Sequence, residues 1–335
     1  MPPLPDPYLV FLGDVANVPL AKTAFGLRDW RPDEVVGQAR LPGCGVDLGV
    51  PELSPAEAAA RGARGMLIGV APIGGSIPPH WIASLLAGLE SGLDLVSGLH
   101  TRLTDIPALR AAAKRLDRSL YDVRHAQRSF PIATGAKRTG KRLLTVGTDC
   151  ALGKKYAALA IAKALTEHGA DADFRATGQT GIMISGGGVA IDAVPADFVA
   201  GAAEALSPDA EADHWDVIEG QGSLFHPAYA GVSLGLLHGS QPDALVVCHD
   251  PSRLTLHSHP AFPIVSLETA ISRNLEAARL TNPKAALAGI SINTSSLPLV
   301  AAEALLAELG QTHGAPAFDP VRTSLEPLIA RMRQL

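Results

Sequence analysis

The fold of the second half of this chain is decided by the stretch LLTVGTDCALGKK, residues 143–155. An apolar run ends in a turn that contains glycine, and Lys154 stands where a helical pattern begins and continues from Tyr156 to Leu165. In a phosphate-binding loop, backbone N–H groups at a helix N-terminus face an anion and one lysine reaches it. The stretch therefore predicts a phosphate-binding loop at the end of a strand.

Two departures from the usual loop narrow its chemistry. Gly147 lies one residue further upstream of Gly153 than in the common spacing. Lys155 occupies the position where a serine or threonine hydroxyl normally holds Mg²⁺. We therefore expect a loop that binds a polyphosphate without supporting Mg-ATP hydrolysis. The cofactor-binding residues expected in this loop are Thr148, Asp149, Cys150, Gly153, Lys154 and Lys155.

Composition and charge exclude several other classes of protein. Of the 335 residues, 47% are hydrophobic and 18% are charged, so the chain can bury a large core. The net charge is -5 and no basic run is present, which argues against a nucleic-acid partner. Cys44, Cys150 and Cys248 form no CxxC pair, which indicates a reducing compartment and no structural zinc. We see no signal peptide and no apolar run of the ~18 residues that a membrane span needs, and we expect a soluble, cytoplasmic protein.

Short apolar runs alternate with helical patterns along the chain, which is typical of α/β proteins with parallel sheets. This rhythm is interrupted at residues 124–141, where charges are scattered around Pro131 and Gly135, and we place the domain linker there. We expect an N-terminal Rossmann-like parallel-sheet domain at residues 1–130. A P-loop NTPase-like α/β domain is expected at residues 131–335.

The elements expected in each domain follow from these patterns. In the first domain we expect strands at Tyr8–Leu12, Gly65–Val70, Leu93–Ser97 and Ser119–Val123, and helices at Ser54–Arg61, Trp81–Glu90 and Ala108–Leu116. In the second we expect strands at Arg142–Val146, Phe174–Ala176, Trp215–Ile218, Ala244–Cys248, Ile264–Ser266 and Ala286–Ile292, and further helices at Pro195–Leu206, Glu268–Leu280 and Leu299–Leu309. Ligands of such sheets bind at the carboxyl ends of the strands, so the residues after each strand are the candidates for function.

The segment EGQGSLFHP, residues 219–227, follows one of these strands. A phosphate-loop protein usually carries an acid here, which makes Glu219 a candidate. Two glycines let the backbone approach a ligand closely. Gln221, Ser223 and His226 bring further polar groups to the same edge.

Other residues that follow strands extend the candidate site. Gln179 lies in the glycine-containing segment after the second strand of this domain, and Asn293 stands where phosphate-loop proteins often read a nucleotide base. His249 follows another strand and is a third candidate base. His257 and His259 have H-x-H spacing, but without a third strong ligand they do not predict a metal site.

The first domain has its own loops at the same kind of edge. Gly13 and Asp14 follow the first expected strand. Gly74 and Ser76 precede a helix and can offer backbone N–H groups to a carboxylate, to which Arg102 can add a charge-assisted hydrogen bond. We expect these three residues, together with Gln221, to bind the substrate.

Four segments together are similar to a known family. The segments GTDCALGK (147–154), TGQTG (177–181), EGQGSLFHPAY (219–229) and LLHGSQPDA (236–244) resemble the DgcN family, formerly catalogued as a domain of unknown function. The Gly-Thr-Asp start of the first segment also resembles the phosphate loop of dethiobiotin synthetase. The resemblance to the DgcN family implies transfer of an acetyl group from acetyl-CoA to the amine of D-glutamate or a related D-amino acid.

The candidate residues can support the chemistry that this resemblance implies. Acetyl-CoA, the expected co-substrate, carries a polyanion that the phosphate loop can bind without a metal. An ammonium group must lose a proton before it attacks a thioester, so a base is needed, and we expect Glu219 or, after it, His226, with His249 as the third candidate. Ser223, with the two neighbouring glycines, can stabilise the oxyanion. We expect the site between the two domains, a small-molecule substrate and a homo-oligomer.

Two alternatives remain open at the level of the sequence. The first is a Mg-ATP-dependent ligase or NTPase of the dethiobiotin synthetase kind, because Gly147 and Lys154 fit such a loop. The second is a sensor that binds a nucleotide or CoA without catalysis. Substrate-stimulated phosphate release would indicate the ligase, and tight binding without turnover would indicate the sensor.

Overall fold

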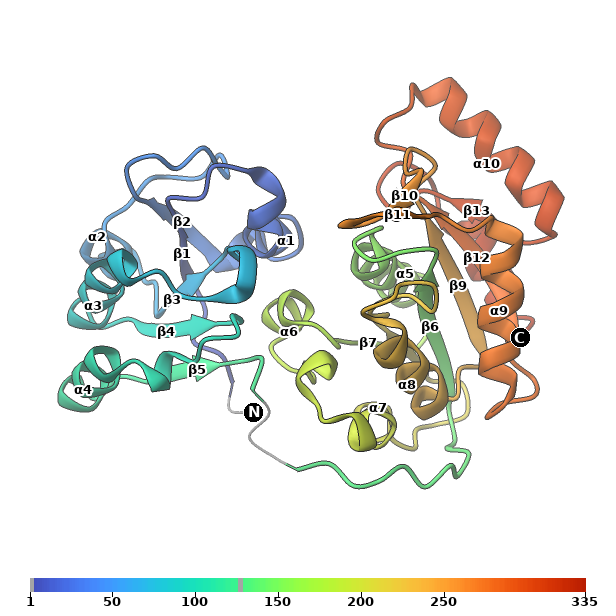
Figure 1. Cartoon of the computed structure of the whole chain (residues 1–335), viewed down its shortest axis with the longest axis horizontal. Helices are drawn as coiled ribbons and strands as arrows, with labels where there is room; N and C mark the ends of the chain where they lie inside the picture. Colours follow the sequence, from blue (N-terminus) through green and yellow to red (C-terminus); the bar gives the residue numbers. More distant parts are fainter. Residues whose placement is uncertain (1–2, 126–128) are drawn as a thin grey trace. The chain divides into compact units, whose positions relative to one another are not determined.

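The computed structural model describes residues 3–125 and 129–335 in two compact units. The first unit combines residues 3–125 with Gly178–Ala193, and the second combines residues 129–177 with Val194–Leu335. Both are α/β units built on sheets of parallel strands (Figure 1). A stretch that the sequence assigned to the second domain, Gly178–Ala193, thus folds with the first. No helix of the described ranges is long and apolar enough to cross a bilayer.

The first unit has a five-stranded parallel sheet of order β2-β1-β3-β4-β5. Its strands are β1 (Tyr8–Gly13), β2 (Val35–Arg40), β3 (Gly65–Ile68), β4 (Asp94–Ser97) and β5 (Leu120–Asp122). Its α-helices are α1 (Lys22–Trp30), α2 (Pro55–Ala60), α3 (Ile82–Glu90), α4 (Pro107–Leu116) and α6 (Gln179–Ser185). The expected N-terminal Rossmann-like fold is confirmed.

The start of α2 shows how local sequence sets an element. Ser54 accepts a hydrogen bond from the N–H of Glu57, while the Glu57 carboxylate accepts one from the N–H of Ser54. This reciprocal capping pairs two donors that a helix start otherwise leaves without partners. Pro55 occupies the first helical position, where its missing N–H costs nothing.

Helix α6 is held to the first unit by contacts with α1 and with the chain after β5. The hydroxyls of Thr23 and Thr180 share a hydrogen bond of 2.8 Å. Arg31 donates to the carbonyl of Ile184 at 2.8 Å. Further along, Arg124 forms an ion pair with Asp192. These contacts explain why this segment leaves the unit that precedes and follows it in the sequence.

The second unit has a six-stranded parallel sheet of order β13-β12-β9-β6-β8-β7. Its strands are β6 (Lys141–Gly147), β7 (Ala172–Arg175), β8 (Trp215–Ile218), β9 (Ala244–His249), β12 (Ala286–Ile292) and β13 (Ala317–Phe318). A separate antiparallel hairpin consists of β10 (Thr255–Leu256) and β11 (His259–Pro263), so the strand expected at 264–266 is wrong. The helices are α5 (Lys154–Glu167), α7 (Val199–Leu206), α8 (Ala230–Ser240), α9 (Leu267–Arg279), α10 (Leu299–His313) and α11 (Glu326–Met332).

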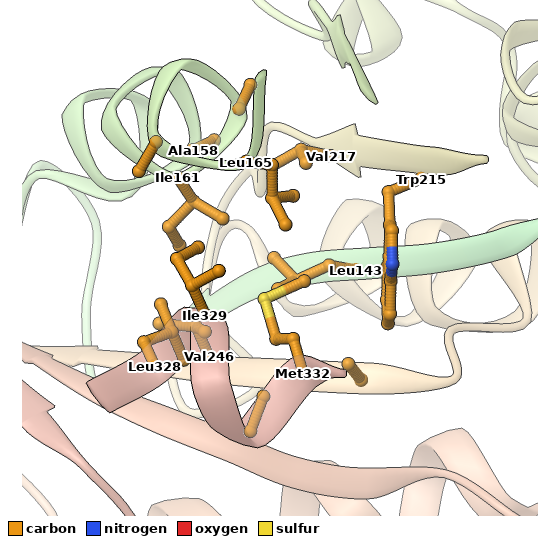
Figure 2. Packing of buried hydrophobic residues seen from close by; sticks show 14 of the residues in the cluster. Leu143, Ala158, Ile161, Leu165, Trp215, Val217, Val246, Leu328, Ile329 and Met332 are labelled. Atoms are coloured by element: carbon orange, nitrogen blue, oxygen red, sulfur yellow. The ribbon is translucent and has the colours of Figure 1, made fainter. Parts of the chain in front are cut away.

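A buried apolar cluster fixes α5 on this sheet. Ile161 and Leu165 of α5 meet Leu143 of β6 and Val217 of β8, and α11 closes the cluster with residues that include Met332 (Figure 2). Fully burying each such side chain contributes about 1.5–3 kcal/mol. Because α5 is anchored along its length, the loop between β6 and α5 is held between two rigid elements.

Candidate active site

The connection from β6 to α5 forms the expected phosphate loop. β6 ends at Gly147 and α5 begins at Lys154, so the first N–H groups of the helix lack partners within the helix. Gly153 adopts φ 107°, a conformation that disfavours a side chain, and Ala151 adopts φ 51°. The loop therefore presents a helix N-terminus at the carboxyl end of a parallel strand, a site suited to an anion.

Lys154 is buried in this loop, with 6% of its surface exposed. Its Nζ donates a hydrogen bond of 2.7 Å to the carbonyl of Asp149. Burial lowers the pKa of Lys154 below its ordinary value, because the charged form loses hydration. Nζ of the next lysine, Lys155, lies 5.0 Å from the centroid of the Tyr156 ring, and its predicted role in binding the cofactor stays a prediction.

The loop is tied to residues on both sides of β10. Arg253 donates to the Asp149 carboxylate at 2.9 Å and to the carbonyls of Cys150 and Ala151, both at 2.7 Å. The N–H of His257 donates to the same carboxylate oxygen of Asp149 at 2.7 Å. This Asp149–Arg253 clamp holds the loop in one conformation. Sequence reasoning missed Arg253, because a single arginine far along the chain carries no local signal.

Three potential metal-ligating groups meet beside the loop. Donor atoms of Asp149, Cys150 and His226 lie within 4.8 Å of one another. Both nitrogens of His226 already have partners: Nδ1 accepts the N–H of Ala228 at 3.2 Å, and Nε2 donates to the carbonyl of His257 at 3.3 Å. Asp149 is neutralised by the clamp. Two of the three groups are therefore committed to contacts within the protein.

The 219–229 segment packs under the phosphate loop. The buried Glu219 carboxylate accepts the N–H of Thr177 at 3.0 Å. The N–H of Gly220 donates to the Thr145 hydroxyl at 2.9 Å, and the hydroxyl of Ser223 donates to the carbonyl of Gly147 at 3.0 Å. These contacts support a role in holding the loop. The expected catalytic roles of Glu219, Ser223 and His226 stay predictions.

Residues at or just beyond the ends of β8, β9 and β12 complete this edge. Nδ1 of His249 lies 3.0 Å from the Thr148 hydroxyl, and burial lowers the pKa of this histidine, opposed by the charge of Asp250. Asn293 donates to Asp250 at 3.2 Å and caps its own turn by accepting from the N–H of Ser295. Gln221 donates to the Thr177 hydroxyl at 3.3 Å. The second unit thus brings together the loop residues, Gln221, His249 and Asn293.

The remaining candidates belong to the first unit. Gln179 lies on α6 with its side chain against Gly98, where an added Cβ would come 2.2 Å from Oε1 of Gln179. The sequence had grouped it with the phosphate loop. Gly74 has φ 82°, and Gly74, Ser76 and Arg102 are exposed. Their predicted role in binding a substrate carboxylate stays a prediction.

A Rossmann-like unit joined to a unit with a phosphate loop at the end of β6 defines a two-domain α/β protein of the P-loop class. Two family models match this division: the DUF1611_N Rossmann-like domain over residues 39–126 and the DUF1611_C P-loop domain over residues 131–329, both described as domains of unknown function. The chain belongs to the DUF1611 family. The expected fold class and the family resemblance are confirmed.

Relatives extend over almost the whole chain. A D-glutamate N-acetyltransferase from Pseudoalteromonas sp is 49% identical over 328 residues, 97% of this chain and 98% of the relative. A D-glutamate N-acetyltransferase from Tritonibacter scottomollicae is 51% identical over 316 residues, 94% of this chain and 95% of the relative. The crystal structure of a DUF1611 family protein from Anabaena variabilis is similar with a TM-score of 0.88 at 32% identity, covering 98% of this chain and 100% of that one.

Proposed function

We propose that this protein is an N-acetyltransferase that moves an acetyl group from acetyl-CoA to the amine of D-glutamate or a related D-amino acid. The observation that carries the proposal is the identity of about half of all residues, over nearly the full length, with two proteins named D-glutamate N-acetyltransferase. Such a match extends through both units rather than through the phosphate loop alone.

The geometry of the loop supports CoA as the donor. The N-terminus of α5 and the buried Lys154 offer N–H donors to a pyrophosphate. Lys155 replaces the hydroxyl that a Mg-nucleotide site uses, and the nearby carboxylate of Asp149 is already paired with Arg253. We therefore propose that the phosphates bind directly to the protein, with no metal required.

The departure of the leaving group needs little help from an acid. The nitrogen lone pair of the substrate attacks the thioester carbonyl, a C–N bond forms, the C–S bond breaks, and CoA leaves as a thiolate. A thiol with a pKa near ~8.5, as in free cysteine, leaves readily without an acid. The substrate ammonium must first give up a proton, and this step requires a base.

The direct test is release of free thiol. Purified protein is incubated with acetyl-CoA and D-glutamate, and the new thiol is measured with a chromogenic disulfide, with L-glutamate and glycine as comparison acceptors. We expect thiol release that depends on the D-amino acid and persists in EDTA. Absence of release above background contradicts the proposal for D-glutamate. Phosphate release from Mg-ATP on addition of the amino acid would instead favour a ligase.

A further inference from the structure

Four aromatic side chains of the second unit form a row beside the phosphate loop. His226 stacks on Tyr229 with ring centroids 4.5 Å apart and meets the ring of His259 edge-on at 4.6 Å. The ring of His259 in turn lies 6.3 Å from that of Phe262 on β11. We call Tyr229, His226, His259 and Phe262 the ring row. All four residues belong to the second unit.

The backbone of His257 fastens the ring row to the phosphate loop. Its carbonyl oxygen lies 3.3 Å from Nε2 of His226 and 3.1 Å from Nδ1 of His259. Because a carbonyl only accepts, both ring nitrogens donate to this one oxygen. The N–H of His257 donates to the Asp149 carboxylate at 2.7 Å. The two inner rings of the row therefore keep a fixed position relative to the loop.

The two ends of the ring row are open to solvent. Tyr229 is 50% exposed and Phe262 is 46% exposed, whereas His226 is buried. Within residues 3–125 and 129–335, Tyr229 and Phe262 are the two aromatic members of the exposed large hydrophobic side chains. Exposed aromatic surface is typical of places that a ligand or a partner covers. The second unit thus places its exposed rings next to its anion site.

The ring row lies at the switch point of the six-stranded sheet. In the order β13-β12-β9-β6-β8-β7, the chain leaves β6 toward β7 on one side, and β9 lies on the other. Open parallel sheets bind ligands at such a point, outside the carboxyl ends of the strands. The phosphate loop follows β6, and the hairpin that carries His259 and Phe262 follows β9. A ligand whose phosphates occupy the loop therefore has the ring row as its neighbour.

The chemistry of the ring row suits the pantetheine arm of CoA better than its adenine. The arm carries a geminal dimethyl group and short methylene chains, which gain from contact with ring surface. Recognition of a nucleobase also needs hydrogen-bonding groups directed at its edge. Here both nitrogens of His226 and Nδ1 of His259 already have partners within the protein. The row therefore offers apolar contact rather than polar recognition.

We propose that the ring row is the subsite for the pantetheine arm of CoA. The phosphates bind at the loop, and the arm runs from there across Tyr229 and Phe262. The row contributes affinity for the arm and sets the direction in which the thioester leaves the loop. This inference rests on the proposed acetyltransferase function, because it takes CoA as the ligand of the loop. The adenine of a nucleotide and a second copy of the chain are the other possible occupants.

Calorimetric titrations with three probes test the assignment: CoA, pantetheine, and 3′-phospho-ADP, which is CoA without the arm. We expect Tyr229→Ala and Phe262→Ala each to raise the Kd for CoA and for pantetheine by the same factor. The factor should be roughly 3- to 15-fold, since a half-exposed ring contributes about half of what full burial does. The Kd for 3′-phospho-ADP should stay the same, and Tyr229→Phe, which keeps the ring, should bind every probe like the wild type.

The matched control is Leu280→Ala. Leu280 is 74% exposed and lies between the end of α9 and the amino end of β12, at the opposite edge of the sheet from the loop. Its truncation removes exposed apolar surface from the same unit. We expect its Kd values for all three probes to equal those of the wild type.

Several results would overturn the subsite. A loss of affinity for 3′-phospho-ADP without a loss for pantetheine would assign the rings to the adenine. A lower oligomeric state of the alanine variants in light scattering, with unchanged Kd values, would assign them to a second copy of the chain. Unchanged Kd values without that effect, or a wild-type protein that does not bind pantetheine, would remove the ring row from donor binding.

A measurement on the unmodified protein does not depend on how the variants fold. In NMR spectra of the full-length protein with pantetheine, we expect magnetisation transfer from aromatic ring protons to the geminal methyl groups, and its absence contradicts the subsite. Thiol release judges the proposed function separately. Thiol release by the wild type, with normal binding by the alanine variants, refutes the subsite alone. Ring-dependent binding of pantetheine without thiol release refutes transfer to D-glutamate and leaves the subsite standing.

Discussion

Replacing Lys154 with methionine is the sharpest test of the phosphate loop. An ammonium group has three N–H donors, and one is used by the carbonyl of Asp149, so two remain for phosphate oxygens. We count one bond from these two donors to the bound phosphate, and a hydrogen bond to a charged group contributes about 1.5–3 kcal/mol. Since ~1.4 kcal/mol corresponds to a factor of ten, the Kd for CoA should rise roughly 10- to 150-fold.

The matched control lies on the same helix. Lys163 of α5 is exposed and pairs with Glu167, so Lys163→Met should bind CoA like the wild type. Calorimetric titration with CoA and with pantetheine, which lacks the phosphates, separates the contributions. We expect Lys154→Met to lose affinity for CoA and to keep its affinity for pantetheine. Equal loss for both ligands, or no loss for CoA, would refute the assignment of Lys154 to the phosphates.

The pH dependence of CoA binding follows from the same residue. Burial lowers the pKa of Lys154 in the free protein, and a bound phosphate would raise it again by stabilising the charged form. Binding is then accompanied by proton uptake, so affinity should fall as the pH rises through the lowered pKa. Titrations between neutral and alkaline pH should show this decline in the wild type and a weaker one in Lys154→Met.

Further substitutions distinguish residues that hold the phosphate loop in place from residues that take part in catalysis. Glu219→Gln keeps an oxygen for the N–H of Thr177, so a role in holding the loop predicts near-normal turnover, whereas a loss of roughly 10²–10⁴-fold would identify Glu219 as the base. The unmodified protein should show negligible ATP hydrolysis with Mg²⁺ present, measured as phosphate release, because Lys155 stands where a Mg-nucleotide site uses a hydroxyl. Gly220→Ala would place a Cβ 1.6 Å from a backbone oxygen and should lower the free energy of unfolding in urea by at least ~2 kcal/mol. Gly231→Ala, with nothing within 4 Å, is its control and should be neutral or slightly stabilising.

The parts of the site that could be predicted from the sequence are those with local signatures. A strand, a glycine turn and a lysine at the start of a helix follow one another within residues 143–155, and the structure has them in that order. Arg253 and Asp149, which form the clamp, are 104 positions apart in the sequence, and His80 and Asp14, whose side chains share a hydrogen bond, are 66 positions apart. Such contacts depend on the folded topology and leave no periodic pattern in the chain.

Helix α8 shows why propensity alone missed an element. Its sequence contains Gly231, Gly235 and Gly239, and glycine disfavours a helix by about 1 kcal/mol relative to alanine. In the structure, a Cβ at Gly239 would lie 2.1 Å from the carbonyl oxygen of Ala200 on the neighbouring α7. Close packing of the two helices therefore requires the residue that local rules count against the helix.

The segment Gly178–Ala193 folds with the first unit, and this affects how the chain can be divided into fragments. A cut near residue 130 would follow the boundary between the two family domains, because one ends at residue 126 and the other begins at residue 131. The N-terminal fragment would then lack the partners of Thr23, Arg31 and Arg124 and expose the surface that α6 covers. The C-terminal fragment would carry α6 as an unsupported loop. We therefore expect both fragments to be less stable than the same units in the whole chain.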